Sequence, residues 1–271
     1  MEATLTVVPQ RQESAIFAET LKIALYGRYG SRKTLQIGSL IESVGRDAVV
    51  VVSAERGLNT IQSVLKQENV LVANDLPELR KAFAHIKEHH NTSDWWVCID
   101  GGSQVMEWIA TLHMHGADEF YDLSSRNLPI PDAIKPFGRY MSDKSHTIDA
   151  QKIYGRIGRD SEALLAAWVR LNCNLYVNYL EDMAGTSGRE KSLPWGPDVP
   201  GKVGLKAVMS SFDYVGRLTY DSDGRLVGGF DARSPIYMAR TREDRKAGVE
   251  IPPEIVEFTL AAFVRLIQGS R

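Results

Sequence analysis

Short apolar runs alternate with segments of helical periodicity along the first two thirds of the chain. The run DAVVVVSAE (47–55) is continuous and β-branched, which is typical of a strand buried on both faces of a sheet. We predict strands over residues 21–27, 47–55, 69–74, 95–100 and 174–180. We predict helices over residues 33–44, 57–68, 76–90, 103–121 and 150–171. This alternation predicts βαβ units, and therefore an α/β fold with a mostly parallel central sheet flanked by helices.

The pattern changes at two long polar segments and again toward the end of the chain. Residues 122–149 and 184–203 are rich in proline or glycine and predict long loops of the kind that are usually functional or mobile. Asp223-Gly224 lies between two strand-like runs and predicts a C-terminal β-hairpin. We interpret residues 1–20 as an N-terminal leader and 21–271 as a single domain. Its C-terminal hairpin and strand part covers 213–242, with a further strand over 234–242 and a terminal helix over 254–268.

Composition sets limits on the class of protein. The 271 residues are 44% hydrophobic and 24% charged, which is typical of a globular protein of one large domain. The net charge of −2 gives no global basic field, so nucleic-acid binding would need a local patch. The first residues lack the features of a signal peptide, and no apolar stretch approaches the ~20 residues that cross a bilayer. We therefore expect a cytoplasmic protein without a membrane partner.

A phosphate-binding loop is predicted between the first strand and the first helix. The segment reads Gly-Arg-Tyr-Gly-Ser-Arg-Lys-Thr, and a strand before it and a helix after it are the context that a P-loop needs. Lys33 would reach the outer phosphates, and the Thr34 hydroxyl would bind Mg²⁺. The predicted nucleotide-binding residues are Gly27, Arg28, Tyr29, Gly30, Ser31, Arg32, Lys33 and Thr34.

Arg32 departs from the usual P-loop pattern, which has glycine directly before the lysine. Glycine there lets the backbone lie against the phosphates. Arg32 could clash with the nucleotide, turn outward, or add a cation to the phosphate site. The alternative is a chance basic turn between a strand and a helix. Whether this loop permits hydrolysis therefore stays open at the level of sequence.

Two carboxylates follow predicted buried strands. Asp100 ends the run WWVCID, the Walker B arrangement in which the carboxylate holds the magnesium shell. Glu55 ends the second predicted strand, at the carboxyl edge of the sheet, where a carboxylate can orient or deprotonate an attacking water. The alternative for Glu55 is a solvated glutamate at a strand end.

In order and spacing, these elements resemble the RecA-like core ATPases. A more specific resemblance is to the phage-encoded group of minimal RecA-core AAA-type ATPases, which includes single-strand annealing proteins of the Sak-four type. It rests on the P-loop, on Ser53-Ala54-Glu55-Arg56-Gly57 and on Ile99-Asp100-Gly101, and covers roughly residues 21–253. The residue identities match loosely, and Arg32 is one departure from the family's pattern.

The resemblance implies roles for further residues. Glu55 takes the role of the catalytic base, Lys33 and Thr34 the P-loop roles, Asp100 the Walker B role and Asn178 that of a polar sensor on a later strand. Arg240 and Arg242 stand where the family has Lys-x-Arg, and would act in a neighbouring subunit's site like arginine fingers. The alternative is a solvated cluster, since residues 240–246 are highly charged.

The resemblance also implies that two loops bind single-stranded DNA. The matching loops are 122–149 and 184–203, where cations alternate with aromatic residues, as backbone contact and base stacking require. The candidate DNA-binding residues are Arg139, Lys144, Arg189, Lys191, Trp195 and Lys202. The alternative is that both loops are solvated linkers.

The expected function is Mg²⁺-dependent ATP hydrolysis coupled to single-stranded DNA binding or annealing, in phage DNA recombination or replication. The expected cofactors are ATP and Mg²⁺, and the expected assembly is a homo-oligomeric ring or filament in the bacterial host cytoplasm. A single-strand binding protein or another replication or recombination protein could be a further partner. One alternative is a degenerate, non-hydrolysing P-loop scaffold that binds DNA or a partner. A second alternative is a loader or motor accessory that uses ATP but contacts protein.

Overall fold

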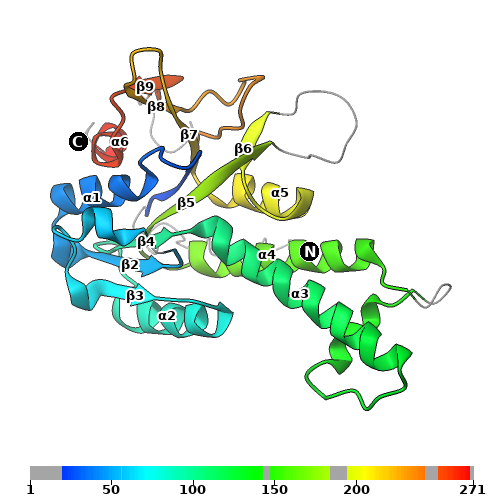
Figure 1. The fold of residues 1–271 in the computed structure, drawn as a ribbon. Helices are drawn as coiled ribbons and strands as arrows, with labels where there is room; N and C mark the ends of the chain where they lie inside the picture. Colours follow the sequence, from blue (N-terminus) through cyan, green and yellow to red (C-terminus); the bar gives the residue numbers. More distant parts are fainter. Residues whose placement is uncertain (1–19, 56, 143–146, 184–193, 242–249, 269–271) are drawn as a thin grey trace, which may run out of the picture.

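A central β-sheet organises the chain in the computed structural model, which describes residues 20–55, 57–142, 147–183, 194–241 and 250–268 (Figure 1). Within these residues the strand order is β3-β2-β4-β5-β1-β7-β8-β9, with β6 paired to β5 outside this path. The strands are β1 (Lys22–Gly27), β2 (Val49–Ser53), β3 (Val70–Val72), β4 (Trp96–Asp100), β5 (Asn174–Met183), β6 (Trp195–Pro197), β7 (Tyr214–Tyr220), β8 (Leu226–Gly229) and β9 (Glu254–Val256).

The strands from β3 to β7 in this order are parallel. Each neighbouring pair among β3, β2, β4, β5, β1 and β7 runs in the same direction. The pairs β7–β8, β8–β9 and β5–β6 are antiparallel. This topology confirms the predicted α/β class, with a mostly parallel sheet and a C-terminal hairpin. The carboxyl ends of the parallel strands share one edge of the sheet, where ligands bind in open α/β folds.

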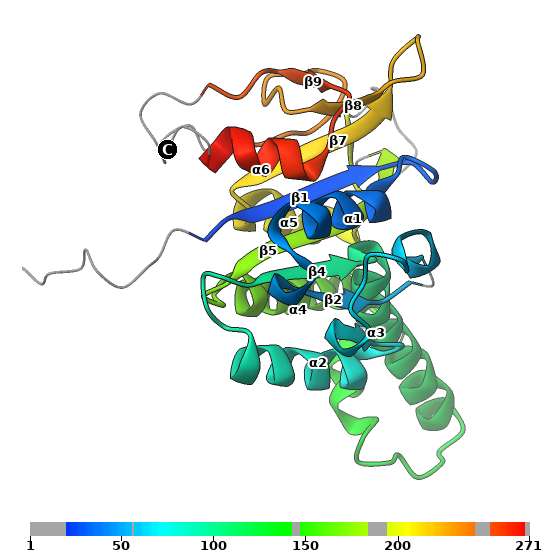
Figure 2. The ribbon, with the colours of Figure 1, turned by 90° about the vertical axis from the view of Figure 1, so that its left-hand side faces the viewer.

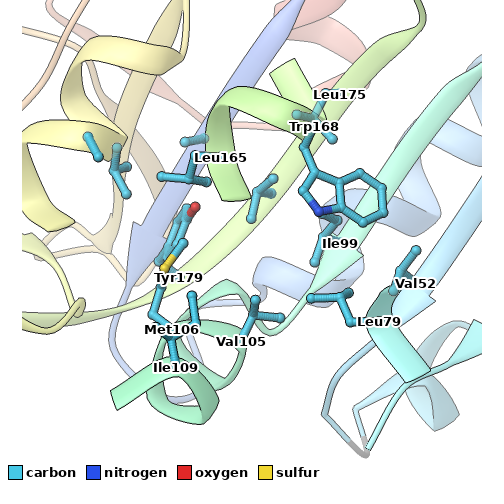
Figure 3. Packing of buried hydrophobic residues seen from close by; sticks show 14 of the residues in the cluster. Val52, Leu79, Ile99, Val105, Met106, Ile109, Leu165, Trp168, Leu175 and Tyr179 are labelled. Atoms are coloured by element: carbon cyan, nitrogen blue, oxygen red, sulfur yellow. The ribbon is translucent and has the colours of Figure 1, made fainter. Parts of the chain in front are cut away.

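Helices cover both faces of the sheet (Figures 1 and 2). They are α1 (Lys33–Val44), α2 (Leu76–His89), α3 (Gly102–Ser125), α4 (Ala150–Val169), α5 (Gly201–Ser211) and α6 (Leu260–Gln268). Strand β1 explains the two layers, because its alternate residues enter different cores. Ile23 and Leu25 pack with α1 and α6, while Ala24 and Tyr26 join the cluster formed with α2, α3, α4 and α5. Figure 3 shows part of the cluster formed with α2, α3, α4 and α5, which includes Trp168 of α4. No helix in the described part of the chain is long and apolar enough to span a membrane.

Several predicted elements differ from the structure. Residues 57–68 form two 3-10 turns, η2 (Leu58–Ile61) and η3 (Gln67–Asn69), rather than an α-helix. The reason is tertiary packing, since Ile61 lies so close to Gly38 of α1 that a Cβ there would be 2.9 Å from its side chain. Helix α5 begins inside the predicted loop 184–203 and was not predicted. Residues 234–241 make only isolated bridges, through Tyr237 and Arg240, in place of the predicted strand.

The predicted terminal helix over 254–268 begins too early. Residues Glu254–Val256 form the edge strand β9, and α6 starts at Leu260. The two prolines before β9 favour extended backbone, and Glu257 has a positive φ of 56°, which a continuous helix does not permit. The hydrophobic pattern therefore predicted the presence of α6 correctly but placed its first residue too early.

An arm projects beyond the sheet on the side of α3 and α4 (Figure 1). We use this name for the C-terminal half of α3, the 3-10 helix η4 (Lys135–Tyr140) and the N-terminal half of α4. The predicted loop 122–149 therefore contains ordered structure. η4 packs tightly on α3, since a Cβ at Gly116 would lie 2.5 Å from the Phe137 ring and one at Gly138 would lie 2.6 Å from the Phe120 ring.

Candidate active site

The predicted P-loop joins the carboxyl end of β1 to the start of α1. β1 ends at Gly27 and α1 begins at Lys33, so the strand-loop-helix arrangement is present. Gly27 leaves no space for a side chain, because a Cβ there would lie 2.5 Å from the Leu218 carbonyl oxygen of β7. The Ser31 N–H donates to the Arg28 carbonyl oxygen at 3.2 Å, which closes the loop. Tyr29 lies in the middle of this loop and is 84% exposed.

Arg32 has a left-handed backbone, with φ 58° and ψ 29°. This conformation costs a residue with a side chain about 1–2 kcal/mol, which explains why glycine is usual at this position. The Arg32 guanidinium lies 5.9 Å from the centroid of the Tyr220 ring, and the Tyr220 hydroxyl donates to the Gly30 carbonyl oxygen at 3.1 Å. The Arg32 side chain is therefore exposed and lies beside Tyr220 of β7.

Substitution Arg32→Gly is expected to raise the free energy of unfolding by roughly 0.5–1 kcal/mol. Relief of the left-handed strain, about 1–2 kcal/mol, exceeds the entropy cost of about 0.4–1 kcal/mol that a new glycine brings to the unfolded chain. Urea denaturation measures the difference. The control is Arg46→Gly, at another exposed arginine whose φ is not positive, and it should destabilise the protein. Equal losses in both variants would show that the strain at residue 32 is unimportant.

The Lys33 ammonium lies across the loop that precedes it. Its Nζ donates to the carbonyl oxygens of Gly27 and Arg28, each at 2.8 Å, and lies 3.4 Å from Ser31 Oγ. Partial burial lowers the pKa of Lys33, and the nearby carboxylates of Glu55, Asp100 and Glu181 oppose that shift. A cation is thus held among loop oxygens at the edge of the sheet.

Asp100, at the end of β4, is the centre of a buried polar cluster. Thr34 Oγ1 donates to Asp100 Oδ1 at 2.9 Å, and the Asn178 side-chain amide donates to the same oxygen. Asn178 Oδ1 in turn accepts from the Gly101 N–H at 2.7 Å, so Asn178 positions Asp100. The other carboxylate oxygen, Asp100 Oδ2, is buried and has no hydrogen-bond partner among the described residues. Burial raises the pKa of Asp100, although the bonds from Asn178 and Thr34 and the charge of Lys33 lower it.

Glu55 lies beside Asp100, directly after β2. The Ala54 N–H donates to the Asp100 carbonyl oxygen at 2.9 Å, which ties the two strand ends together. Gly101 has φ 103°, and a Cβ there would be 2.6 Å from Glu55 Cγ, so only glycine fits. The half-buried Glu55 carboxyl has its pKa raised by desolvation and by the Asp100 charge, while Lys33 lowers it. The three predicted elements therefore meet at one place.

A buried ion pair next to the P-loop was not predicted. Arg217 of β7 donates to Glu181 of β5 at 2.6 Å, and the two side chains are 14% and 1% exposed. The Arg217 guanidinium lies 5.7 Å from the Trp195 ring centroid, and that of Arg28 lies 4.9 Å from it. Trp195 thus connects the P-loop to β5, β6 and β7. Sequence names Arg28 as a nucleotide-binding candidate and Trp195 as a DNA-binding candidate. It offers no signal that Glu181 and Arg217 join them, because these residues come from segments far apart in the chain.

The remaining predicted residues are separate from this cluster. Arg240 donates to the Met209 carbonyl oxygen of α5 at 2.5 Å, so its guanidinium is occupied within its own chain. Arg139 is exposed on the arm and Lys202 is exposed at the start of α5. The predicted residues that lie outside the described part of the chain are Lys144, Arg189, Lys191 and Arg242.

Comparisons with known proteins give likenesses of low similarity. No protein-family model matches the chain, and no curated protein sequence matches it. Among solved structures, a RadB recombinase is 14% identical with a TM-score of 0.41, over 89% of this chain and 87% of that one. The ATPase EscN from the type III secretion system of enteropathogenic E. coli, solved with its central stalk EscO, is 14% identical with a TM-score of 0.40. That likeness covers 74% of this chain and 42% of the EscN chain. At these values neither likeness assigns an activity or a partner to this chain.

Proposed function

We propose that this protein binds ATP with Mg²⁺ and hydrolyses the β–γ phosphate bond. The observation that carries the proposal is the unpartnered Asp100 Oδ2, buried beside the Thr34 hydroxyl at the mouth of a P-loop. A buried carboxylate oxygen without a donor is costly unless it has a function or a partner. A cation bound at this position would supply that partner.

The residues present fit Mg²⁺. Its preferred ligands are oxygens, of which a protein typically provides one or two while phosphates and water provide the rest. Asp100 Oδ2 and Thr34 Oγ1 are the oxygens that would hold it. Gly57 borders both, and a Cβ there would lie 3.1 Å from the first and 3.3 Å from the second. When bound, Mg²⁺ supplies positive charge against the phosphate oxygens.

Lys33 and the start of α1 would bind the phosphates. The first turn of α1 contains no acidic residue of its own, and the positive end of a helix dipole favours an anion. The Lys33 ammonium exchanges the carbonyl oxygens of Gly27 and Arg28 for phosphate oxygens, a stronger charge-assisted contact. For this exchange the Arg32 side chain would have to stay beside Tyr220, where the structure has it.

Glu55 would act as the general base. The water oxygen attacks the γ-phosphorus, the bond from that phosphorus to the β–γ bridging oxygen breaks, and ADP leaves with the bridging oxygen. The Glu55 carboxylate takes the proton of the water. Its raised pKa suits this role, since a base is most effective when its pKa is near the working pH.

We further propose that the partner is single-stranded DNA, in a RecA-like homo-oligomer that serves phage recombination or replication. Arg139 and Lys202 support a DNA contact, since both are exposed and neither bonds to a nucleotide-site residue in the described part of the chain. A finger role for Arg240 in a neighbouring subunit would require its guanidinium to leave Met209.

The first test is equilibrium binding of a fluorescent ATP analogue with Mg²⁺. Lys33→Ala should weaken binding about 10- to 100-fold, because a hydrogen bond to a charged group contributes about 1.5–3 kcal/mol. Lys81→Ala, at an exposed lysine of α2, is the control and should bind like wild type. The same assay is made on Arg32→Gly. If this variant binds nucleotide and wild type does not, the hypothesis of a non-hydrolysing scaffold replaces that of an ATPase.

A further inference from the structure

The arm contains a basic pocket that is separate from the P-loop. It is a cavity of about 300 Å³ between η4 and α4, and four of its seven lining residues are cations. These four are Arg139, Lys152, Arg156 and Arg159. Tyr140 forms part of the wall, and no carboxylate lines the cavity. An opening of this composition favours an anion.

The four cations are only partly neutralised by their neighbours. Arg156 Nε contacts Asp160 at 3.0 Å, and Lys152 Nζ donates to the Met141 carbonyl oxygen at 2.8 Å. Arg139 lies 5.2 Å from the centroid of the Tyr140 ring, which carries no net charge. Arg159 is exposed and has no ion-pair partner among the residues that the structure describes. The pocket therefore keeps a positive charge that a ligand could offset.

A buried hydrogen-bonded chain holds the pocket wall in place. Tyr140 Oη lies 2.8 Å from His113 Nδ1, and His113 Nε2 lies 2.8 Å from Asp160 Oδ2, which also contacts Arg156. Both His113 and Tyr140 are buried. With a proton on Nε2, His113 donates to Asp160, and its Nδ1 accepts a hydrogen bond from the Tyr140 hydroxyl, so every member is satisfied. The chain fixes Tyr140 and Arg156 before any ligand binds, and such preorganisation lowers the entropic cost of binding.

Phosphate is the anion that these side chains recognise best. Guanidinium groups are planar forks that match phosphate oxygens, and three of the four cations are arginines. Helix α4 also packs closely against the start of α5. A Cβ at Gly158, next to Arg159, would lie 2.5 Å from Val203, the residue after Lys202. The exposed Lys202 therefore belongs to a helix that packs on α4.

We propose that this pocket binds a phosphate group of the backbone of single-stranded DNA. Anion binding by the pocket is inferred from the residues that line it, whereas the identification of the ligand as single-stranded DNA rests on the proposed function. The other source of the same chemistry is a free phosphate anion.

The first experiment compares two double variants that each remove two cations, one pair from the pocket and one pair from helix α2. Lys152→Gln with Arg159→Gln removes two positive charges from the pocket and leaves the hydrogen bonds among Tyr140, His113 and Asp160 intact. Lys81→Gln with Lys87→Gln is the matched control, at two exposed cations of α2 that lie outside the pocket and outside both predicted DNA-binding loops. Binding of labelled oligo-dT is measured by fluorescence anisotropy over a series of NaCl concentrations. The pocket variant should lose about 0.7 from the slope of log K against log salt, the value for one phosphate contact on a single strand. The control should keep the wild-type slope, and an equal change in both variants would overturn the pocket.

The second experiment separates the pocket from the DNA proposal. Thermal unfolding is followed in inorganic phosphate and in NaCl of equal ionic strength, with Lys33→Ala as the parent so that the P-loop lysine does not contribute. Phosphate should raise Tm in the parent more than in the parent carrying Lys152→Gln and Arg159→Gln. Equal stabilisation of both would overturn the pocket. A difference here, with no effect of the pocket variant on oligo-dT binding, would overturn the strand as the source and identify a free phosphate anion.

Discussion

Replacement of Glu55 by glutamine is expected to lower ATP turnover by about 10²- to 10⁴-fold, the usual contribution of a general base. Binding of Mg²⁺ and ATP should persist, because the amide has the size of the carboxyl and neither Lys33 nor Thr34 bonds to Glu55. Phosphate release at saturating ATP and binding of a fluorescent ATP analogue give the two readings. Glu42→Gln, at an exposed glutamate of α1, is the control and should leave both unchanged. Loss of binding in parallel with turnover would contradict the role of a base.

The pH profile of turnover gives an independent check of Glu55. Desolvation and the neighbouring Asp100 charge raise the pKa of Glu55, and a base acts only when deprotonated. Turnover should therefore rise as the pH increases through this raised pKa, and fall below it. The acid limb should disappear in the residual activity of Glu55→Gln. A limb that survives the substitution would have to be assigned to another group.

The candidate site could be predicted from sequence where its parts are local. Lys33 and Thr34 follow a strand within a few residues, and Asp100 and Glu55 each end an apolar run. Parallel strands bring such ends to one edge without any further information. The resemblance also pointed to Asn178, although its contact with Asp100 through a hydrogen bond is known only from the structure.

Features that depend on distant segments could not be predicted. The Glu181–Arg217 pair joins two strands on opposite sides of β1, and the pocket on the arm joins η4 to α4. The orientation of Arg32 depends on Tyr220, which reaches the P-loop from β7. Sequence could name Arg32 as a departure from the pattern, but its place beside the Tyr220 ring is known only from the structure.

Substitution Asp100→Asn should abolish the dependence of ATP binding and turnover on Mg²⁺. The amide replaces the unpartnered Oδ2 with an N–H₂ group, which cannot ligate a cation. Turnover should fall on the order of a hundredfold or more, since a catalytic metal contributes several kcal/mol and each 1.36 kcal/mol is tenfold in rate. Nucleotide binding is titrated with and without EDTA. A variant that keeps the full Mg²⁺ enhancement would exclude Asp100 as a ligand.

The same substitution should stabilise the nucleotide-free protein at neutral pH. Burial raises the pKa of Asp100 in the folded state, so its ionisation opposes folding at a pH above that value. This cost disappears as the pH falls through the folded pKa, because the buried group is then neutral. The amide introduced by Asp100→Asn carries no charge, and its oxygen can still accept from Thr34 and Asn178, whereas Asp100→Ala loses both bonds and should destabilise the protein. The stability advantage of Asp100→Asn over wild type should therefore be largest at neutral pH and shrink on acidification. That pattern in urea denaturation would mean that the carboxylate is retained for binding a cation at the expense of stability, whereas an advantage independent of pH would mean that charge burial is not its cause.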